Sequence, residues 1–171
     1  DLSMHVLFRV DGGPEIGYCH LIRSNALAEE LINRGHEVSV ATTTSSSARS
    51  VFPECVDVLE LSSRDEPEPF TGLFDAVMPD VVFTDAYPVD TVYQRAIRDR
   101  VPCAVLQDDA RHAVCADIFI NGNLYADSIG YQFVDKKPRV CLGTDYVLLR
   151  REIRERIPDD PLCQESPRRA I

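Results

Sequence analysis

The sequence predicts an α/β fold of the Rossmann-like class, with a mostly parallel sheet and helices on both faces. Short apolar, β-branched runs alternate with segments of helical spacing along most of its 171 residues. The first of these segments form a strand, a glycine-rich loop, an amphipathic helix and a second strand. Such a βαβ unit has parallel strands and a right-handed crossover. We expect one domain over residues 1–157, a length sufficient for one sizeable core.

The first βαβ unit spans residues 4–42. Residues 4–10 (MHVLFRV) form a short apolar run that ends in a glycine-rich loop, as a strand does. Apolar residues then recur at helical spacing from His20 to Arg34, and Gly35 supplies a C-terminal stop. Residues 36–42 (HEVSVAT) alternate in polarity and are rich in β-branched side chains, which predicts the second strand.

The same alternation continues through the rest of the expected domain. Further strands are predicted at residues 56–61, 80–85, 103–107, 117–120 and 139–142, the last two at the far edge of the sheet. Helices are predicted at residues 45–52, 70–78, 91–100 and 146–157. Residues 158–171 hold three prolines and show no periodicity, so we expect a linker at a domain boundary.

Charge and composition exclude several classes of partner. A net charge of −10 argues against nucleic acid or an anionic membrane surface. No apolar run approaches the ~20 residues of a membrane span, and no signal peptide is evident, so we expect a cytoplasmic protein. Only Lys136 and Lys137 are lysines among 18 basic residues. An acidic chain with few lysines suggests a halophilic source, although a GC-rich genome explains the same bias.

The six cysteines show neither a CxxC pair nor the spacing of a zinc site. Cys103 and Cys141 lie in apolar, strand-like runs and are expected to be buried thiols. We expect no disulfide framework and no metal site.

The first candidate site is the loop from Asp11 to His20, which follows the first strand. Ligands of doubly wound sheets bind outside the carboxyl ends of the strands. Gly12 and Gly17 permit a close approach of the backbone to a ligand, and the helix that begins near His20 directs its amides to the same place. We expect Asp11, Gly12 and Gly17 to contact substrate. The loop has no GxGxxG spacing, so no nicotinamide cofactor is expected.

His20 and Arg23 lie one helical turn apart on the same face. The positive end of the helix dipole keeps His20 neutral, and a neutral imidazole can remove a proton from water or from a hydroxyl. The alternative is a histidine that only bonds its own loop. Arg23 is expected to pair with a substrate phosphate or with Asp11, the alternative being an ordinary surface ion pair.

Two further candidates lie at strand ends. Asp85 closes a buried strand and Tyr87 follows it, an arrangement typical of sugar sites, although Asp85 can equally cap the next helix. Gln107 precedes two aspartates, of which only one can face the cleft because neighbouring side chains in extended backbone point oppositely. We take Asp108 as the substrate-binding one. His5, His36 and His112 receive no role.

An ordered series of blocks resembles the UDP-sugar hydrolases of the pseudaminic acid pathway and the related spore-coat polysaccharide biosynthesis proteins. The blocks are Arg9-Val10-Asp11, Ile16-Gly17-Tyr18-Cys19-His20-Leu21-Ile22-Arg23, Ala26-Leu27-Ala28-Glu29-Glu30-Leu31, Arg34-Gly35-His36-Glu37-Val38, Asp85-Ala86-Tyr87, Gln107-Asp108-Asp109, Asn121-Gly122-Asn123 and residues 141–150. Together they cover residues 4 to about 155.

This resemblance implies a two-domain, glycosyltransferase-B-like fold of which the chain is the N-terminal half. In such a fold the N-terminal domain holds the sugar, and a C-terminal nucleotide-binding domain, which these residues do not include, holds UDP. The resemblance implies that water cleaves the sugar–UDP bond without a metal or cofactor. It places the catalytic histidine on His20 and a sugar-site tyrosine on Tyr87. The expected substrate is therefore a UDP-linked amino sugar of surface-polysaccharide or nonulosonic-acid biosynthesis.

One position departs from the family's pattern. The family has Gly-x-Gly-His before the helix, and Cys19 replaces the second glycine. We expect a side chain there to change the loop or to narrow the pocket. Two other functions stay open at this point. One is a glycosyltransferase of the same fold, and the other is a catalytically silent domain that binds a sugar or assembles with a separate nucleotide-binding chain.

Overall fold

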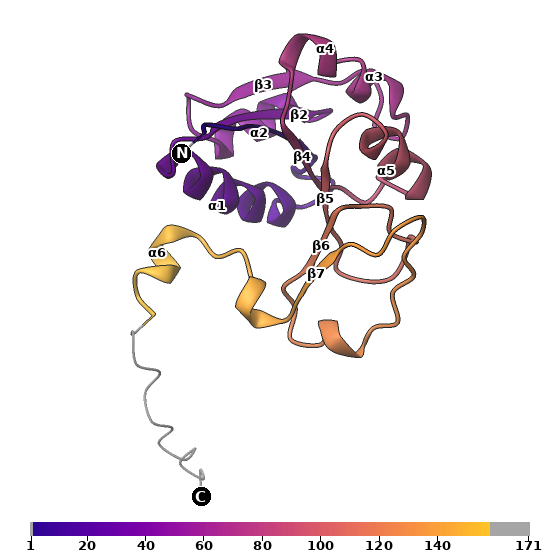
Figure 1. Cartoon of the computed structure of the whole chain (residues 1–171). Helices are drawn as coiled ribbons and strands as arrows, with labels where there is room; N and C mark the ends of the chain where they lie inside the picture. The colour runs from indigo at the N-terminus through magenta and orange to yellow at the C-terminus, as the bar shows by residue number, and fades with distance from the viewer. Residues whose placement is uncertain (1, 158–171) are drawn as a thin grey trace, which may run out of the picture.

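A computed structural model describes residues 2–157, and its strands and helices alternate as the sequence predicts (Figure 1). The strands are β1 His5–Val10, β2 Glu37–Thr42, β3 Asp57–Glu60, β4 Val81–Asp85, β5 Cys103–Leu106, β6 Ile118–Asn121 and β7 Arg139–Leu142. The helices are α1 Cys19–Asn33, α2 Ser45–Val51, α3 Glu68–Thr71, α4 Phe74–Val77, α5 Thr91–Arg98 and α6 Arg151–Arg154, with 3₁₀ turns η1 Ala126–Ser128 and η2 Thr144–Tyr146.

All seven strands form one parallel sheet in the order β3-β2-β1-β4-β5-β6-β7. The strand order reverses between β1 and β4, where Val10 is the register partner of Asp85. This is the doubly wound arrangement, and its ligands bind at the reversal, beyond the carboxyl ends of the strands. The predicted Rossmann-like α/β class is therefore confirmed.

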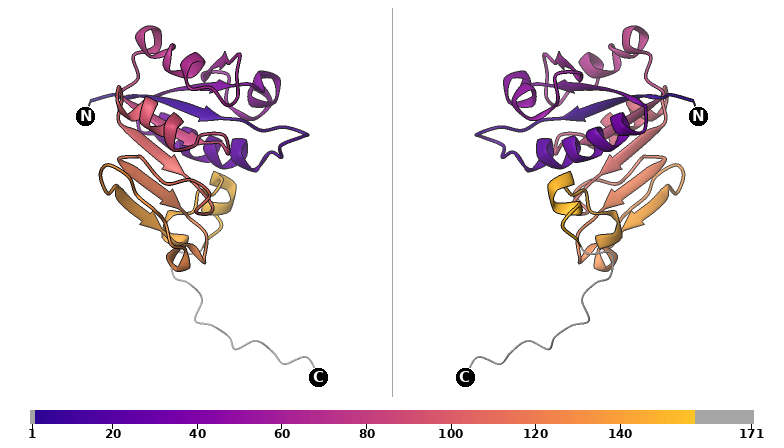
Figure 2. Two further views of the ribbon diagram at one scale, coloured as in Figure 1. Left: turned by 90° about the vertical axis from the view of Figure 1, so that its right-hand side faces the viewer. Right: turned by 90° about the vertical axis from the view of Figure 1, so that its left-hand side faces the viewer.

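Two apolar clusters cover the two faces of the sheet. On one face α1 and α2 pack over Phe8 and Val40, and Leu21 and Phe52 complete this cluster. On the other face α3, α4 and α5 pack around Leu7 and its neighbours. Figure 2 shows the arrangement, with α5 in front of the strands in the left view and α1 in front in the right view. Strands buried on both sides explain the near-continuous apolar runs of β4 and β5.

The helix predicted at residues 70–78 is wrong in extent. The structure has two short helices, α3 and α4, separated by Gly72 and Leu73. Glycine is a poor helix residue, which favours a break at this point. Phe70 and Phe74 are buried and meet edge to face, with 5.3 Å between their ring centroids.

The helix predicted at residues 146–157 is also wrong. Tyr146 ends the 3₁₀ turn η2, Val147 and Arg150 have extended backbone, and the only α-helical part of the described segment is the single turn of α6. The extended segment lies against Gly122, where a Cβ atom would come within 2.7 Å of the Val147 Cα. Leu148 packs on the cluster under α1, so tertiary packing outweighs helix propensity here.

Several other expectations concern single features. Cys103 and Cys141 are buried, as predicted, and the five cysteines among residues 2–157 are free thiols. None of the helices in this part of the chain has the length and apolarity needed to cross a bilayer. The linker expected at residues 158–171 lies outside the described residues.

Candidate functional site

Four of the predicted site residues meet at the point where the strand order reverses. Asp85 is the last residue of β4, and Asp108 follows β5. His20 and Arg23 project from the first turns of α1, which follows β1. Parallel strands end at one edge of the sheet, so residues from distant parts of the sequence come together there. These four residues are called the carboxyl-edge cluster below.

His20 and Asp85 form the centre of this cluster. His20 Nδ1 lies 2.7 Å from Asp85 Oδ1, and both side chains are buried. Nδ1 also lies 3.2 Å from Arg23 Nη2, which can only donate, whereas the Asp85 carboxylate can only accept. The contact with Asp85 is the shorter one, so we assign the proton to Nδ1, which donates it to Asp85. The other ring nitrogen, Nε2, is buried and has no hydrogen-bond partner within residues 2–157. In the neutral ring, Nε2 is therefore the basic atom.

Arg23 lies between two carboxylates. Its Nε and Nη2 donate to Asp85, and its Nη1 and Nη2 donate to Asp108 at 2.8 and 3.0 Å. Of the two expected partners of Arg23, Asp11 is wrong, because Asp11 directly follows β1 and pairs with Arg9. Burial raises the pKa of Asp108, but the hydrogen bond from Arg23 more than offsets this and holds the pKa below its ordinary value. The same two ion pairs outweigh burial and raise the pKa of Arg23.

The alternative role for Asp85, as a helix cap, is wrong. Asp90 is the N-cap of α5, since its Oδ1 accepts a hydrogen bond from the Tyr93 amide at 2.9 Å. Asp85 instead serves the carboxyl-edge cluster. Asp108 and Asp109 separate as predicted: Asp108 faces Arg23, whereas Asp109 turns to Arg111, with a shortest contact of 2.8 Å.

Tyr87 borders the cluster on the loop after β4. Its ring meets the His20 ring edge to face, with 4.6 Å between the centroids. The Arg111 guanidinium lies over the Tyr87 ring, 4.0 Å from its centroid. His112 Nε2 donates to the Tyr87 carbonyl oxygen at 2.9 Å. A small cavity opens here, and its volume of about 10 Å³ suits a single water molecule.

The glycine-rich loop after β1 lies apart from the carboxyl-edge cluster. Gly13 and Gly17 pair through two backbone hydrogen bonds of 3.1 and 2.7 Å, and both have positive φ. Gly12 is fixed by packing, because a Cβ there would come within 2.6 Å of Leu21 Cγ. A Cβ at Gly17 would meet nothing within 4 Å, so the positive φ is its steric requirement. Gly12 and Gly13 line a hollow with Thr44.

Asp11 is not brought to this hollow or to the carboxyl-edge cluster. Its carboxylate is buried and forms an ion pair of 2.9 Å with the fully buried Arg9. Thr42 and Thr43 donate three further hydrogen bonds to its Oδ1. In this structure the side chain predicted to bind substrate therefore ties the end of β1 to the end of β2.

Cys19 is accommodated without backbone strain. It is the first residue of α1, it is exposed, and it is absent from the non-glycine residues with positive φ in the described chain. The positive φ of the loop falls on Gly17 and not on residue 19, so the backbone at Cys19 needs no glycine. The side chain at this position points to the surface at the start of the helix.

The sequence interpretation missed the second wall of the site. Arg111 and His112 border Tyr87, although His112 had received no role. Asn123 donates to Asp108 at 3.0 Å, and it also donates to Asn121 at 2.7 Å. A second cavity lies beyond Asp108 and is lined by Asn123 and Val147 among others. The cluster of polar residues directly after β5 and β6 was the signal available in the sequence.

The arrangement suits proton transfer more than metal binding. Within residues 2–157, no three His, Cys, Asp or Glu side chains gather as metal ligands. His20 offers one basic nitrogen, Nε2, while Asp85 fixes the other ring nitrogen, Nδ1. This is the pattern of a general base oriented by a carboxylate.

Comparison with known proteins supplies no family. No family model matches the chain, and no curated protein matches it. Solved structures with a similar arrangement include CalG4, the calicheamicin glycosyltransferase, at 20% identity over 62% of this chain and 31% of that one, with a TM-score of 0.46. UDP-glucose 4-epimerase of Thermus thermophilus, in complex with NAD, is 17% identical over 72% of this chain and 40% of its own, with a TM-score of 0.46.

A third structure is the Bordetella bronchiseptica enzyme WbmH in complex with NAD⁺. It is 17% identical over 68% of this chain and 45% of its own, with a TM-score of 0.44. The chain thus spans less than half the length of each of these proteins. The fold class of this chain rests on its strand order.

Proposed function

We propose that this chain is the sugar-side domain of a nucleotide-sugar hydrolase, with His20 as the base that activates water. The substrate is a UDP-linked amino sugar of surface-polysaccharide or nonulosonic-acid biosynthesis. The observation that carries the proposal is the buried His20–Asp85 pair at the reversal of strand order, with Nε2 of His20 left without a partner among the described residues. The resemblance to the pseudaminic-acid hydrolases gives the substrate class.

The chemical step follows from the tautomer of His20. Nε2 takes a proton from a water molecule while the water oxygen bonds to the anomeric carbon of the sugar. The bond between that carbon and the UDP oxygen breaks, and UDP leaves with its electron pair as a stabilised anion. Asp85 stays ionised and supports the imidazolium that forms, as a carboxylate partner does in an acid–base pair. The free sugar and UDP are the two products.

The nucleotide site is proposed to lie in a second domain. In the proposed two-domain arrangement, residues 1–157 are the sugar side of a glycosyltransferase-B-like fold and residues 158–171 are the linker. Arg23, the candidate phosphate contact, already has both of its ionic partners in Asp85 and Asp108. This supports a sugar-facing role for the carboxyl-edge cluster, with the UDP phosphates held elsewhere.

The test measures UDP released from a UDP-linked 2,4-diacetamido sugar by the full-length protein. We expect release by the natural protein and a loss of roughly 10²–10⁴-fold in kcat for His20→Ala, the usual contribution of a general base. Cys19→Gly is the matched control next to it, because residue 19 is exposed and its backbone is unstrained. Equal turnover by natural protein and His20→Ala would remove His20 from the mechanism.

A glycosyltransferase is the second candidate. The cavity beyond Asp108, lined by Tyr146, Val147 and Leu148, provides a separate place for an acceptor next to the same cluster. His20 would then remove the proton of an acceptor hydroxyl in place of a water proton. UDP release that requires an added acceptor would favour the transferase, and release in buffer alone would favour the hydrolase. No release under either condition would leave the silent sugar-binding domain.

A further inference from the structure

In the described structure His20, the proposed base, is shielded from solvent. The Nε2 atom of His20 is buried, and the His20 side chain as a whole is only 3% exposed. The Tyr87 ring lies against the His20 ring, whereas Tyr87 itself is 41% exposed. The cavity on the other side of Tyr87 has room for water and not for a sugar. Nε2 is therefore enclosed in this structure, and the partly exposed Tyr87 ring is the side chain that lies against the His20 ring from the cavity side.

Tyr87 is held in this position from the loop that follows β5. Arg111 covers its ring at 4.0 Å, and His112 binds its carbonyl oxygen. Arg111 is fixed in turn by Asp109, which accepts from the Arg111 amide, Nε and Nη2. A planar guanidinium held by a carboxylate and stacked on an aromatic ring is a geometry that lysine cannot reproduce.

We propose that Arg111 is a positioning residue that holds Tyr87 over the basic nitrogen of His20. This rests on the proposed function in treating Nε2 as the working atom. Arg111 does not reach His20 itself, and it acts through the Tyr87 ring. Its stacking energy determines how often Nε2 is uncovered. Weakening the stack uncovers His20 more often, without any change in the His20–Asp85 pair.

The experiment measures how fast diethyl pyrocarbonate modifies each histidine, by mass spectrometry of the four histidine peptides. This reagent acylates an accessible, unprotonated imidazole nitrogen. His36, half-buried at the opposite edge of the sheet, is the internal reference in every sample. We expect Arg111→Gln to raise the rate at His20 relative to His36 by about threefold or more, the change that corresponds to one exposed cation–π contact.

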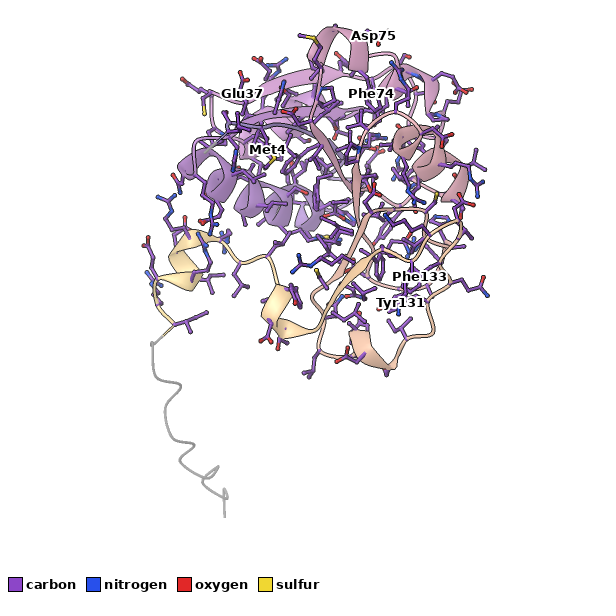
Figure 3. The ribbon with its side chains drawn as sticks, in the orientation of Figure 1. Met4, Glu37, Phe74, Asp75, Tyr131 and Phe133 are labelled. Carbon is purple, nitrogen blue, oxygen red and sulfur yellow. The ribbon has the colours of Figure 1, made fainter. Side chains whose placement is uncertain are left out.

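The matched control is Arg100→Gln. Arg100 also pairs with an aspartate, Asp75 at 2.7 Å, and its guanidinium also lies over an aromatic ring, Phe74 at 5.2 Å. Phe74 and Asp75 belong to α4 and are labelled in the upper part of Figure 3. Arg100→Gln should leave the relative rate at His20 unchanged. Tyr87→Phe should also keep His20 protected, and Tyr87→Ala should expose it most.

An unchanged relative rate at His20 in Arg111→Gln overturns the proposal, as does an equal rise in Arg100→Gln. If Arg111→Gln unfolds, its histidines react alike, and Arg111→Lys then decides by the same criterion. Because the readout is reactivity and not UDP release, the outcome is independent of the hydrolysis assay. A cover confirmed on a protein that releases no UDP would refute the proposed function alone.

Discussion

Two buried charge clusters at neighbouring strand ends have different tasks. The Arg9–Asp11 pair is enclosed by threonines and by Tyr93, whose hydroxyl oxygen accepts from Arg9 Nε at 3.1 Å. Each cluster keeps a buried nitrogen without a hydrogen-bond partner among the described residues, Nη1 of Arg9 in the first and Nε2 of His20 in the second. A neutral imidazole nitrogen can take up a proton, whereas a guanidinium can only donate, so the His20–Asp85 pair is the one suited to proton transfer. Substitution of Asp85 should therefore change activity, and substitution of Asp11 should change stability.

Asp85→Asn tests the orienting carboxylate. The amide can donate to Nδ1, which favours the tautomer with its proton on Nε2 and removes the basic atom. We expect kcat for UDP release to fall by roughly 10³-fold or more in the full-length protein, with little change in KM. Asp90→Asn is the control, since Asp90 caps α5 outside the cluster. A rise in KM without a change in kcat would contradict the role assigned to Asp85.

Asp11 predicts how stability depends on pH. Burial raises the Asp11 pKa, but hydrogen bonds from Arg9 and the threonines outweigh it, so the pKa in the folded state lies below the ordinary 3.8. A carboxylate whose pKa is depressed by folding contributes stability above its unfolded-state pKa, and this contribution is lost as the pH falls.

Asp11→Asn should therefore cost roughly 3–5 kcal/mol of unfolding free energy at about pH 6, because it leaves Arg9 buried without its partner. The difference from the natural protein should shrink as the pH falls toward about 3. Urea titrations across this range measure it. Asp75→Asn, which alters an exposed pair with Arg100, is the control. A difference that does not vary with pH would show that Asp11 contributes no charge pairing.

The helices and strands that depend on local sequence pattern were predicted correctly. All seven strands were expected, because each is a short apolar run. α1 ends at Asn33, and Gly35 follows with positive φ as the predicted C-terminal stop. The segment after β7 was mistaken for a helix, since its extended form depends on contact with Gly122, a residue far away in sequence. The same limit applies to the site. His20, Arg23, Asp85 and Asp108 follow from strand ends, but the stacking of Arg111 on Tyr87 depends on three-dimensional loop packing.

Gly122→Ala tests that contact. The added Cβ would lie 2.7 Å from Val147 Cα and 2.9 Å from the Tyr146 carbonyl oxygen, both of which are backbone atoms. We expect a loss of about 1–3 kcal/mol in unfolding free energy, as for other overpacked sites. Gly130→Ala is the matched control, because its Cβ would meet nothing within 4 Å and its φ is not positive. Equal stability of the two variants would show that the extended segment is not held at Gly122.

In the whole molecule, the sheet topology brings the site residues together, and the amino-acid composition determines the charge of the surface. The reversal of strand order between β1 and β4 brings α1 and the ends of β4 and β5 to one edge. The same fold carries a net charge of −10 with only two lysines. Self-repulsion of such a surface is screened by salt, since the Debye length falls to about 3 Å at 1 M.

The halophile hypothesis is tested by thermal unfolding in a KCl series. If the acidic surface is an adaptation to salt, the melting temperature rises steadily into the molar range, beyond the ~0.1–0.2 M at which ordinary surface repulsion is already screened. A melting temperature that does not rise in molar KCl would favour codon bias as the origin of the arginine excess.

The proposed mechanism requires that His20 presents an unprotonated Nε2 because Asp85 holds the proton on Nδ1. ¹⁵N NMR of the imidazole nitrogens in the chain itself, at about pH 8 where a histidine is ordinarily neutral, reads this directly. We predict the Nδ1-protonated tautomer for His20, and the Nε2-protonated tautomer in Asp85→Asn. A His20 whose proton lies on Nε2 in the natural chain would contradict the proposed base and the mechanism built on it.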